Sequence, residues 1–153
     1  NIIYVGEIIK IFPNAKFIHT FRNPLDSVIS IYQSMLPDLS WAHNIENILI
    51  YVDNYLKVMD SFKSKYKENI IDIKLENFTK NSEELGKLIF KFCKLSWSDN
   101  TLKFYERKNL YSKTLSFRQI RSKVTKYDQK QYEPYFHLLN PYKKKYKWLD
   151  ILN

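Results

Sequence analysis

The stretch FPNAKFIHTFRNPLDSVISIY, residues 12–32, decides the fold, because it joins a strand pattern to a helix pattern through a sharp corner. The segment 15–21 carries apolar side chains on both faces, which is typical of a strand buried at the centre of a parallel sheet. A helix should follow Arg22, because Asn23 is a good N-cap, Pro24 suits the first helical position and Asp26 suits the positive end of the helix dipole. The corner therefore predicts a strand followed at once by a helix.

The rest of the chain continues this alternation. Apolar residues at helical spacing predict helices over about 2–12, 45–66 and 82–95, the last with Ser82 as its cap, and a final helix from about residue 129. The run IIDIKL predicts a second strand after a polar turn at 37–44 and the long helix. The polar, basic and aromatic stretch after about residue 97 has no strong period and predicts a long functional loop. Alternating strands and helices favour a single α/β domain over residues 1–153, with a parallel sheet covered by helices on both faces.

Composition limits the partners that this domain can have. The chain has 153 residues, 44% of them hydrophobic, which excludes a disordered polymer. Its formal net charge of +9 favours a phosphate-bearing ligand, nucleic acid, an acidic protein or a membrane surface. No run approaches the roughly 20 apolar residues that would span a bilayer. The first residue is Asn and an apolar helical pattern begins at once, so we expect a fragment that lacks its beginning.

Arg22 stands at the carboxyl end of the first strand, which is where ligands bind in open α/β sheets. The following helix presents a polar face that includes Ser27, Ser30 and Ser34. The planar guanidinium group can donate two parallel hydrogen bonds to a phosphate, and a serine hydroxyl adds a neutral donor. A structural arginine beside a solvated serine face would show the same spacing, which alone does not separate the two interpretations.

The same stretch resembles the 3′-phosphate-binding segment of sulfotransferases that use 3′-phosphoadenosine 5′-phosphosulfate (PAPS). The likeness is greatest to tyrosylprotein sulfotransferases and to bacterial sulfotransferase domains found with tetratricopeptide repeats. These proteins carry a similar lead-in, then an arginine, turn residues, and a serine eight positions after the arginine. The resemblance implies that Arg22 and Ser30 hold the 3′-phosphate of the donor.

Two later stretches resemble the same family in the same order. IIDIKLENFTKNSEELGKLIFKFCKLSWSDN is similar to a strand, a YE-x-L segment and the helix after it, although Leu75 stands in place of the tyrosine. KTLSFRQIRSKV is similar to the late loop that closes over the nucleotide, with Lys123 in place of the usual proline. Ser34 replaces a second arginine of some relatives. The resemblance implies nucleotide-binding roles for four residues of the late loop: Thr114, Ser116, Gln119 and Arg121. It also implies that Ser116 has a catalytic role, in stabilising the transition state.

As a whole, the resemblance implies a three-layer parallel sheet flanked by helices, the P-loop nucleoside-triphosphate-hydrolase-like fold of sulfotransferases, incomplete at its N-terminus. The 5′-phosphosulfate loop, the catalytic base and a stabilising lysine would precede residue 1, so we expect the C-terminal portion of a catalytic domain, inactive alone. The expected reaction transfers a sulfuryl group from PAPS to a hydroxyl of a tyrosyl protein, carbohydrate or small alcohol. It leaves 3′-phosphoadenosine 5′-phosphate (PAP) and requires no metal. Tetratricopeptide repeats would precede the domain in some relatives, and a cytoplasmic location is favoured if the protein is bacterial.

Three alternatives remain open from the sequence. Lysines and tyrosines in NPYKKKYKWLD, residues 140–150, would suit a nucleic-acid-binding module. We instead expect a C-terminal helix with Tyr142, Tyr146 and Leu149 packed down, and no nucleic-acid partner. A nucleotide kinase fragment would need a Walker loop upstream, and a non-catalytic nucleotide-binding module would need neither loop. His19 lies inside the first strand, and we interpret it as a structural histidine rather than a general base.

Overall fold

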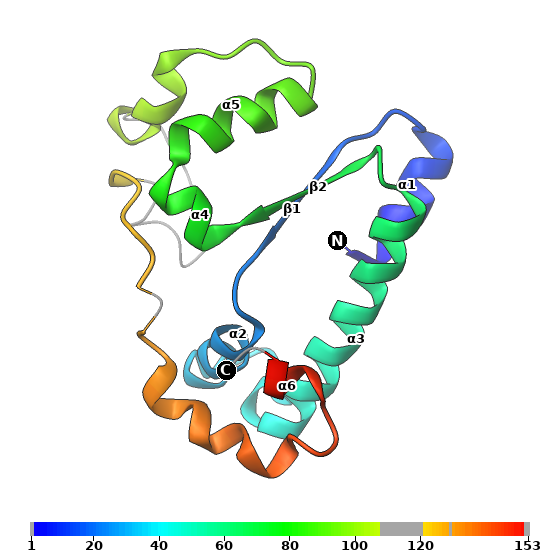
Figure 1. Ribbon diagram of the computed structural model, residues 1–153, viewed down its shortest axis with the longest axis vertical. Helices are drawn as coiled ribbons and strands as arrows, with labels where there is room; N and C mark the ends of the chain where they lie inside the picture. Colours follow the sequence, from blue (N-terminus) through cyan, green and yellow to red (C-terminus); the bar gives the residue numbers. More distant parts are fainter. Residues whose placement is uncertain (1, 108–120, 129, 152–153) are drawn as a thin grey trace.

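The computed structural model describes residues 2–107, 121–128 and 130–151. Figure 1 shows two central strands with the long helix α3 on one side and the pair α4 and α5 on the other. The α-helices are α1 (Val5–Ile11), α2 (Pro24–Gln33), α3 (Ile45–Lys65), α4 (Leu75–Lys80), α5 (Ser82–Phe92) and α6 (Trp148–Ile151). The 3₁₀-helices are η1 (Ile2–Tyr4), η2 (Ser40–His43), η3 (Asp99–Glu106) and η6 (Glu133–Tyr142).

The sheet is a small parallel pair of strands in a mostly helical chain, β1 (Phe17–Phe21) and β2 (Ile70–Lys74), and the parallel direction is as predicted. Phe17 lies opposite Ile70, and Phe21 lies opposite Lys74, so both strands end at the same edge. Parallel strands need a long crossover connection, and α2, η2 and α3 supply it here. The residues that follow the two strands are therefore neighbours.

The corner between β1 and α2 has the predicted capping. The Asn23 side chain accepts a hydrogen bond from the backbone N–H of Leu25 at 3.0 Å, and Pro24 is the first residue of α2. The backbone N–H of Asn23 donates to the buried Glu76 carboxylate at 3.1 Å. Because Glu76 lies at the start of α4, this bond joins the ends of both strands.

The main hydrophobic core lies away from the sheet, between α2, the first half of α3 and the C-terminal segment, which is residues 130–151. Figure 1 shows these elements gathered at one end. Tyr146 and Leu149 are buried in this core, and Tyr142 packs against it. The packing of the C-terminal tail is thus as predicted. Rings held in a core are not free to stack on bases, which weakens the nucleic-acid-binding alternative. No helix in the described residues is both long and apolar enough to cross a bilayer.

Several sequence predictions were wrong in detail. Strand β1 is not central, since β2 is its only strand partner among the described residues. It is not enclosed on both faces either, since Ile18 is 42% exposed. The helix expected from about residue 129 is instead the 3₁₀-helix η6. In an α-helix, the ring of Pro141 would clash with the backbone carbonyl four residues earlier, at His137. Ser82 is the first residue of α5, and its N-cap Asn81 makes no side-chain capping bond. Helix α4 was not foreseen, because six residues directly after a strand carry too little periodicity.

Candidate functional site

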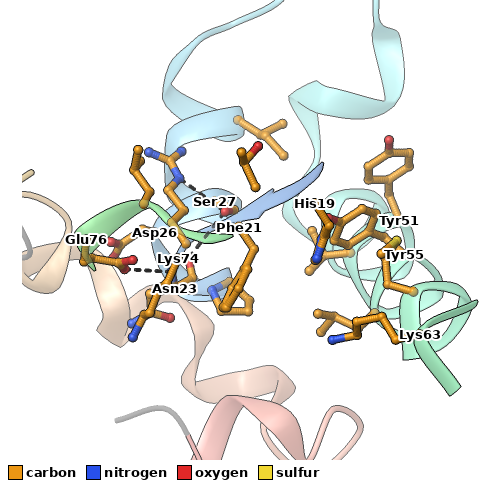
Figure 2. Close-up of a pocket in the computed structure, with 18 of the residues that line it drawn as sticks. His19, Phe21, Asn23, Asp26, Ser27, Tyr51, Tyr55, Lys63, Lys74 and Glu76 are labelled. Carbon is orange, nitrogen blue, oxygen red and sulfur yellow. Dashed lines mark hydrogen bonds between the residues drawn. The ribbon is translucent and has the colours of Figure 1, made fainter. Parts of the chain in front are cut away.

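A cavity of about 930 Å³ opens beside β1 and reaches the edge where both strands end. This volume lies within the range of small-molecule sites in proteins. Figure 2 shows its lining side chains in two groups. One group, at the strand ends, contains Asn23, Asp26, Ser27, Lys74 and Glu76. The other group, between β1 and α3, contains His19, Tyr51, Tyr55 and Lys63.

Arg22 belongs to the wall of this cavity at the end of β1. Its Nε donates to Ser27 Oγ at 3.3 Å, and its Nη1 donates to Tyr127 Oη at 3.3 Å. The guanidinium carbon also lies 5.9 Å from the centre of the Tyr127 ring and 5.5 Å from that of the Tyr132 ring. Rings at such distances attract a cation. Arg22 is therefore contacted both by Ser27 of α2 and by two tyrosines from late in the chain, Tyr127 and Tyr132.

Two buried carboxylates support the corner around Arg22. Asp26 is 1% exposed and its Oδ2 accepts the Tyr127 hydroxyl at 2.8 Å, and Glu76 is 3% exposed. Burial raises the pKa of Asp26, although the hydrogen bond from Tyr127 and the charge of Arg22 oppose the rise. Burial and the bond to Asp26 raise the pKa of Tyr127 far above its ordinary value, so its hydroxyl stays protonated and donates. In the described part of the chain, Asp26 Oδ1 and Glu76 Oε2 are buried without a hydrogen-bond partner.

The second group is built on His19 in the middle of β1. Its Nδ1 lies 2.7 Å from Asp72 Oδ1, and its Nε2 is hydrogen-bonded to the Tyr55 hydroxyl. A carboxylate only accepts, so in a neutral ring Nδ1 carries the proton and Nε2 accepts from Tyr55. Lys63 donates to the other Asp72 oxygen at 3.0 Å. The ring thus has described partners at both nitrogens, as befits a structural histidine.

This network predicts a pH dependence of stability. Burial would raise the pKa of Asp72, but hydrogen bonds from His19 and Lys63 hold it below its usual value of 3.8. Because the folded-state pKa is lowered, ionised Asp72 stabilises the fold above the unfolded value, and this contribution disappears as the pH falls through the folded value. The free energy of unfolding of the wild type should exceed that of Asp72→Asn most near about pH 6, and the difference should shrink below about pH 4. Urea titrations at about pH 6 and at several pH values below about 4 measure the difference, and a difference that stays the same over this whole range would contradict the assignment.

The structure tests the placement of only some predicted site residues. Arg22 lines the cavity, whereas Ser30 lies on α2 outside the lining, and its carbonyl accepts the Ser34 hydroxyl at 2.6 Å. Arg121 is exposed. The predictions for Thr114, Ser116 and Gln119 fall outside the described residues. In the described ranges, no cluster of three or more His, Cys, Asp or Glu side chains could hold a metal ion.

Three contributors to the site escaped the sequence reasoning. Ser27 stood on the predicted polar face of the helix, so its spacing of five from Arg22 was a usable signal. Glu76 directly follows Leu75 in the segment compared with YE-x-L, so its position was also a usable signal. Tyr127 lies 105 residues from Arg22 in the chain, and no local pattern could have joined them.

The comparisons with known proteins cover the part of the chain that contains this corner. Residues 1–99 match the model of a sulfotransferase family, and this segment contains both strands, the Arg22 corner and most of the cavity lining. An uncharacterized protein of Aquifex aeolicus (strain VF5) is 29% identical over 145 residues, which cover 92% of this chain. The matched segment is 19% of that relative, so the chain corresponds to about a fifth of its length. With a match to the family model over more than half of its residues, this chain belongs to the sulfotransferase family.

Proposed function

We propose that this chain binds the 3′-phosphate of PAPS in a protein that transfers the sulfuryl group to a hydroxyl acceptor. The observation that carries the proposal is the placement of Arg22, which lies in the family-matched segment, at the carboxyl end of β1 and on the cavity wall. Ligands of open α/β sheets bind at this edge. The acceptor class remains as the resemblance implies: a tyrosyl protein, a carbohydrate or a small alcohol.

The residues at this corner fit a phosphate group. A guanidinium has five N–H donors, and the two bonds to Ser27 and Tyr127 use two of them. Donors on Nη1 and Nη2 therefore remain uncommitted to described residues. The first turn of α2 adds the positive end of a helix dipole, which favours an anion. Lys74, at the end of β2, adds a second positive charge to the cavity lining.

Each of the two neighbouring carboxylates already accepts a hydrogen bond from a protein group. Asp26 accepts the Tyr127 hydroxyl, and Glu76 accepts the Asn23 backbone N–H. A carboxyl whose pKa is raised by burial, as for Asp26, also carries its negative charge less readily. Arg22, whose guanidinium keeps donors uncommitted to described residues, is therefore the member of this corner best suited to an anion.

In the proposed reaction, the protein acts by positioning and by electrostatic stabilisation. Sulfuryl transfer resembles phosphoryl transfer, an in-line displacement in which charge grows on the leaving oxygen. Arg22 and Ser30 would anchor the nucleotide far from the reacting atoms. Thr114, Ser116, Gln119 and Arg121 would cover it, with Ser116 near the transferred group, and PAP would be the product. In this account residues 1–153 are the C-terminal portion of a three-layer P-loop-like catalytic domain, and other segments supply the base.

A binding and transfer experiment tests this function on the whole protein that carries this chain. Calorimetric titration should show binding of PAP in the absence of metal and much weaker binding of ATP with Mg²⁺. Incubation with ³⁵S-labelled PAPS and a panel of tyrosyl peptides, carbohydrates and simple alcohols should label one acceptor class. Ser30→Ala should weaken PAP binding, because alanine lacks the hydroxyl that is proposed to donate a hydrogen bond to the charged 3′-phosphate. Tight binding of ATP with Mg²⁺ and none of PAP would instead indicate a nucleotide kinase.

A further inference from the structure

We propose that Tyr127 is a positioning residue that orients the Arg22 guanidinium for the 3′-phosphate; this inference rests on the proposed function. Tyr127 lies in the segment 121–128, far from the β1–α2 corner in sequence. It nevertheless contacts Arg22, Asp26 and Thr79 directly. These three residues belong to the end of β1, to α2 and to α4.

The hydrogen bonds around the Tyr127 hydroxyl have a defined direction. Arg22 Nη1 can only donate, so the hydroxyl oxygen accepts from it at 3.3 Å. The hydroxyl proton then goes to Asp26 Oδ2 at 2.8 Å. Burial and the bond to Asp26 keep that proton in place by raising the pKa of Tyr127. The hydroxyl is thereby fixed as an acceptor toward Arg22, and the buried Asp26 carboxylate sets its orientation.

The main chain of Tyr127 is held independently of its side chain. Its backbone N–H donates to Thr79 Oγ1 at 3.0 Å, and the Thr79 hydroxyl donates to the Glu76 carbonyl at 3.3 Å. Both Thr79 and Glu76 belong to α4, whose Glu76 carboxylate accepts from Asn23 next to Arg22. Tyr127 therefore has two attachments to the corner that carries Arg22, one through its hydroxyl and one through its backbone.

Holding Arg22 in this way favours phosphate binding through pre-organisation. A free arginine side chain loses rotamer freedom when it binds an anion, and this loss opposes binding. Ser27 fixes Nε and Tyr127 fixes Nη1, while donors remain for the ligand. Tyr127 need not touch the nucleotide to have this effect. It should therefore matter for recognition of the 3′-phosphate and not for the rest of the nucleotide.

The test compares Tyr127→Phe with Tyr135→Phe in the whole protein by titration with PAP and with adenosine 5′-phosphate, which lacks the 3′-phosphate. Tyr127→Phe keeps the ring beside Arg22 and removes only the hydroxyl, so PAP affinity should fall about tenfold while adenosine 5′-phosphate affinity stays unchanged. Tyr135 is an exposed tyrosine on η6, and Tyr135→Phe should change neither affinity. Thr79→Val leaves the Tyr127 hydroxyl in place but removes the Thr79 hydroxyl that accepts the backbone N–H of Tyr127. It should reproduce the selective loss, and it serves as the test if Tyr127→Phe does not fold.

Arg22→Ala in the same titrations separates the two proposals. If Arg22→Ala weakens PAP binding and the Tyr127 and Thr79 variants do not, the inference is overturned and the proposed function stands. Stronger PAP binding by Tyr127→Phe would also overturn it, because the hydroxyl would then compete with phosphate for Arg22. If Arg22→Ala leaves PAP affinity unchanged, the proposed function fails, and the inference fails with it.

Discussion

Replacement of Leu49 by alanine is expected to lower the free energy of unfolding by about 2–5 kcal/mol, the range for large-to-small substitutions in a core. Leu49 lies on α3 with 0% of its surface exposed, within the cluster formed by α2, α3 and the C-terminal segment. Alanine would lose the burial of the removed carbon atoms and leave a cavity that the rest of the cluster fills only in part. Chemical denaturation followed by circular dichroism measures the change.

Leu88→Ala is the matched control for this prediction. Leu88 is also a helical leucine, on α5, but it is 46% exposed and lies outside the core cluster. Its replacement should cost about 1 kcal/mol or less, because little buried surface is removed. Equal effects at the two positions would contradict the location of the core.

Arg22→Ala is expected to weaken PAP binding by about thirtyfold or more, which corresponds to about 2 kcal/mol. A guanidinium that donates to a phosphate in a partly enclosed site makes a charge-assisted contact, and alanine leaves the phosphate without that partner. The substitution also releases Ser27 and Tyr127 from their bonds to Arg22. Isothermal titration calorimetry of the whole protein measures the loss.

Arg107→Ala controls for the general effect of charge in this experiment. Arg107 is exposed and lies outside the cavity lining, so its removal changes the net charge equally but not the site. PAP affinity should change by less than about twofold at physiological salt, where exposed charges are screened. A loss as large as that of Arg22→Ala would indicate that the overall positive charge, and not this corner, attracts the nucleotide.

The local structure around Arg22 could be predicted because its causes are local. Asn23 and Pro24 specify where α2 begins, and the apolar spacing of residues 45–66 specifies α3 almost to the residue. The exposure of β1 could not be predicted, because burial of a strand depends on what packs against it. Pro141 was visible in the sequence, but apolar spacing alone does not distinguish a 3₁₀-helix from an α-helix around it.

The candidate site likewise has one part that could be predicted from the sequence and one part that could not. The place of Arg22 between a strand and a capped helix could be predicted, and the resemblance implied a phosphate ligand for that arginine. The partners that hold it, Ser27 and Tyr127, come from tertiary contacts, and the contact with Tyr127 spans 105 residues of chain. The cavity itself arises because α3 crosses beside β1, which no motif encodes.

The most direct test of the central claim is a thermodynamic cycle between Arg22 and the 3′-phosphate. Affinities of the wild type and Arg22→Ala are measured for PAP and for adenosine 5′-phosphate. If Arg22 binds the 3′-phosphate, the wild type prefers PAP, and Arg22→Ala loses most of this preference while its affinity for adenosine 5′-phosphate is nearly unchanged. An equal loss of affinity for both nucleotides, or a wild type that does not distinguish them, would contradict the assignment of Arg22 to the 3′-phosphate.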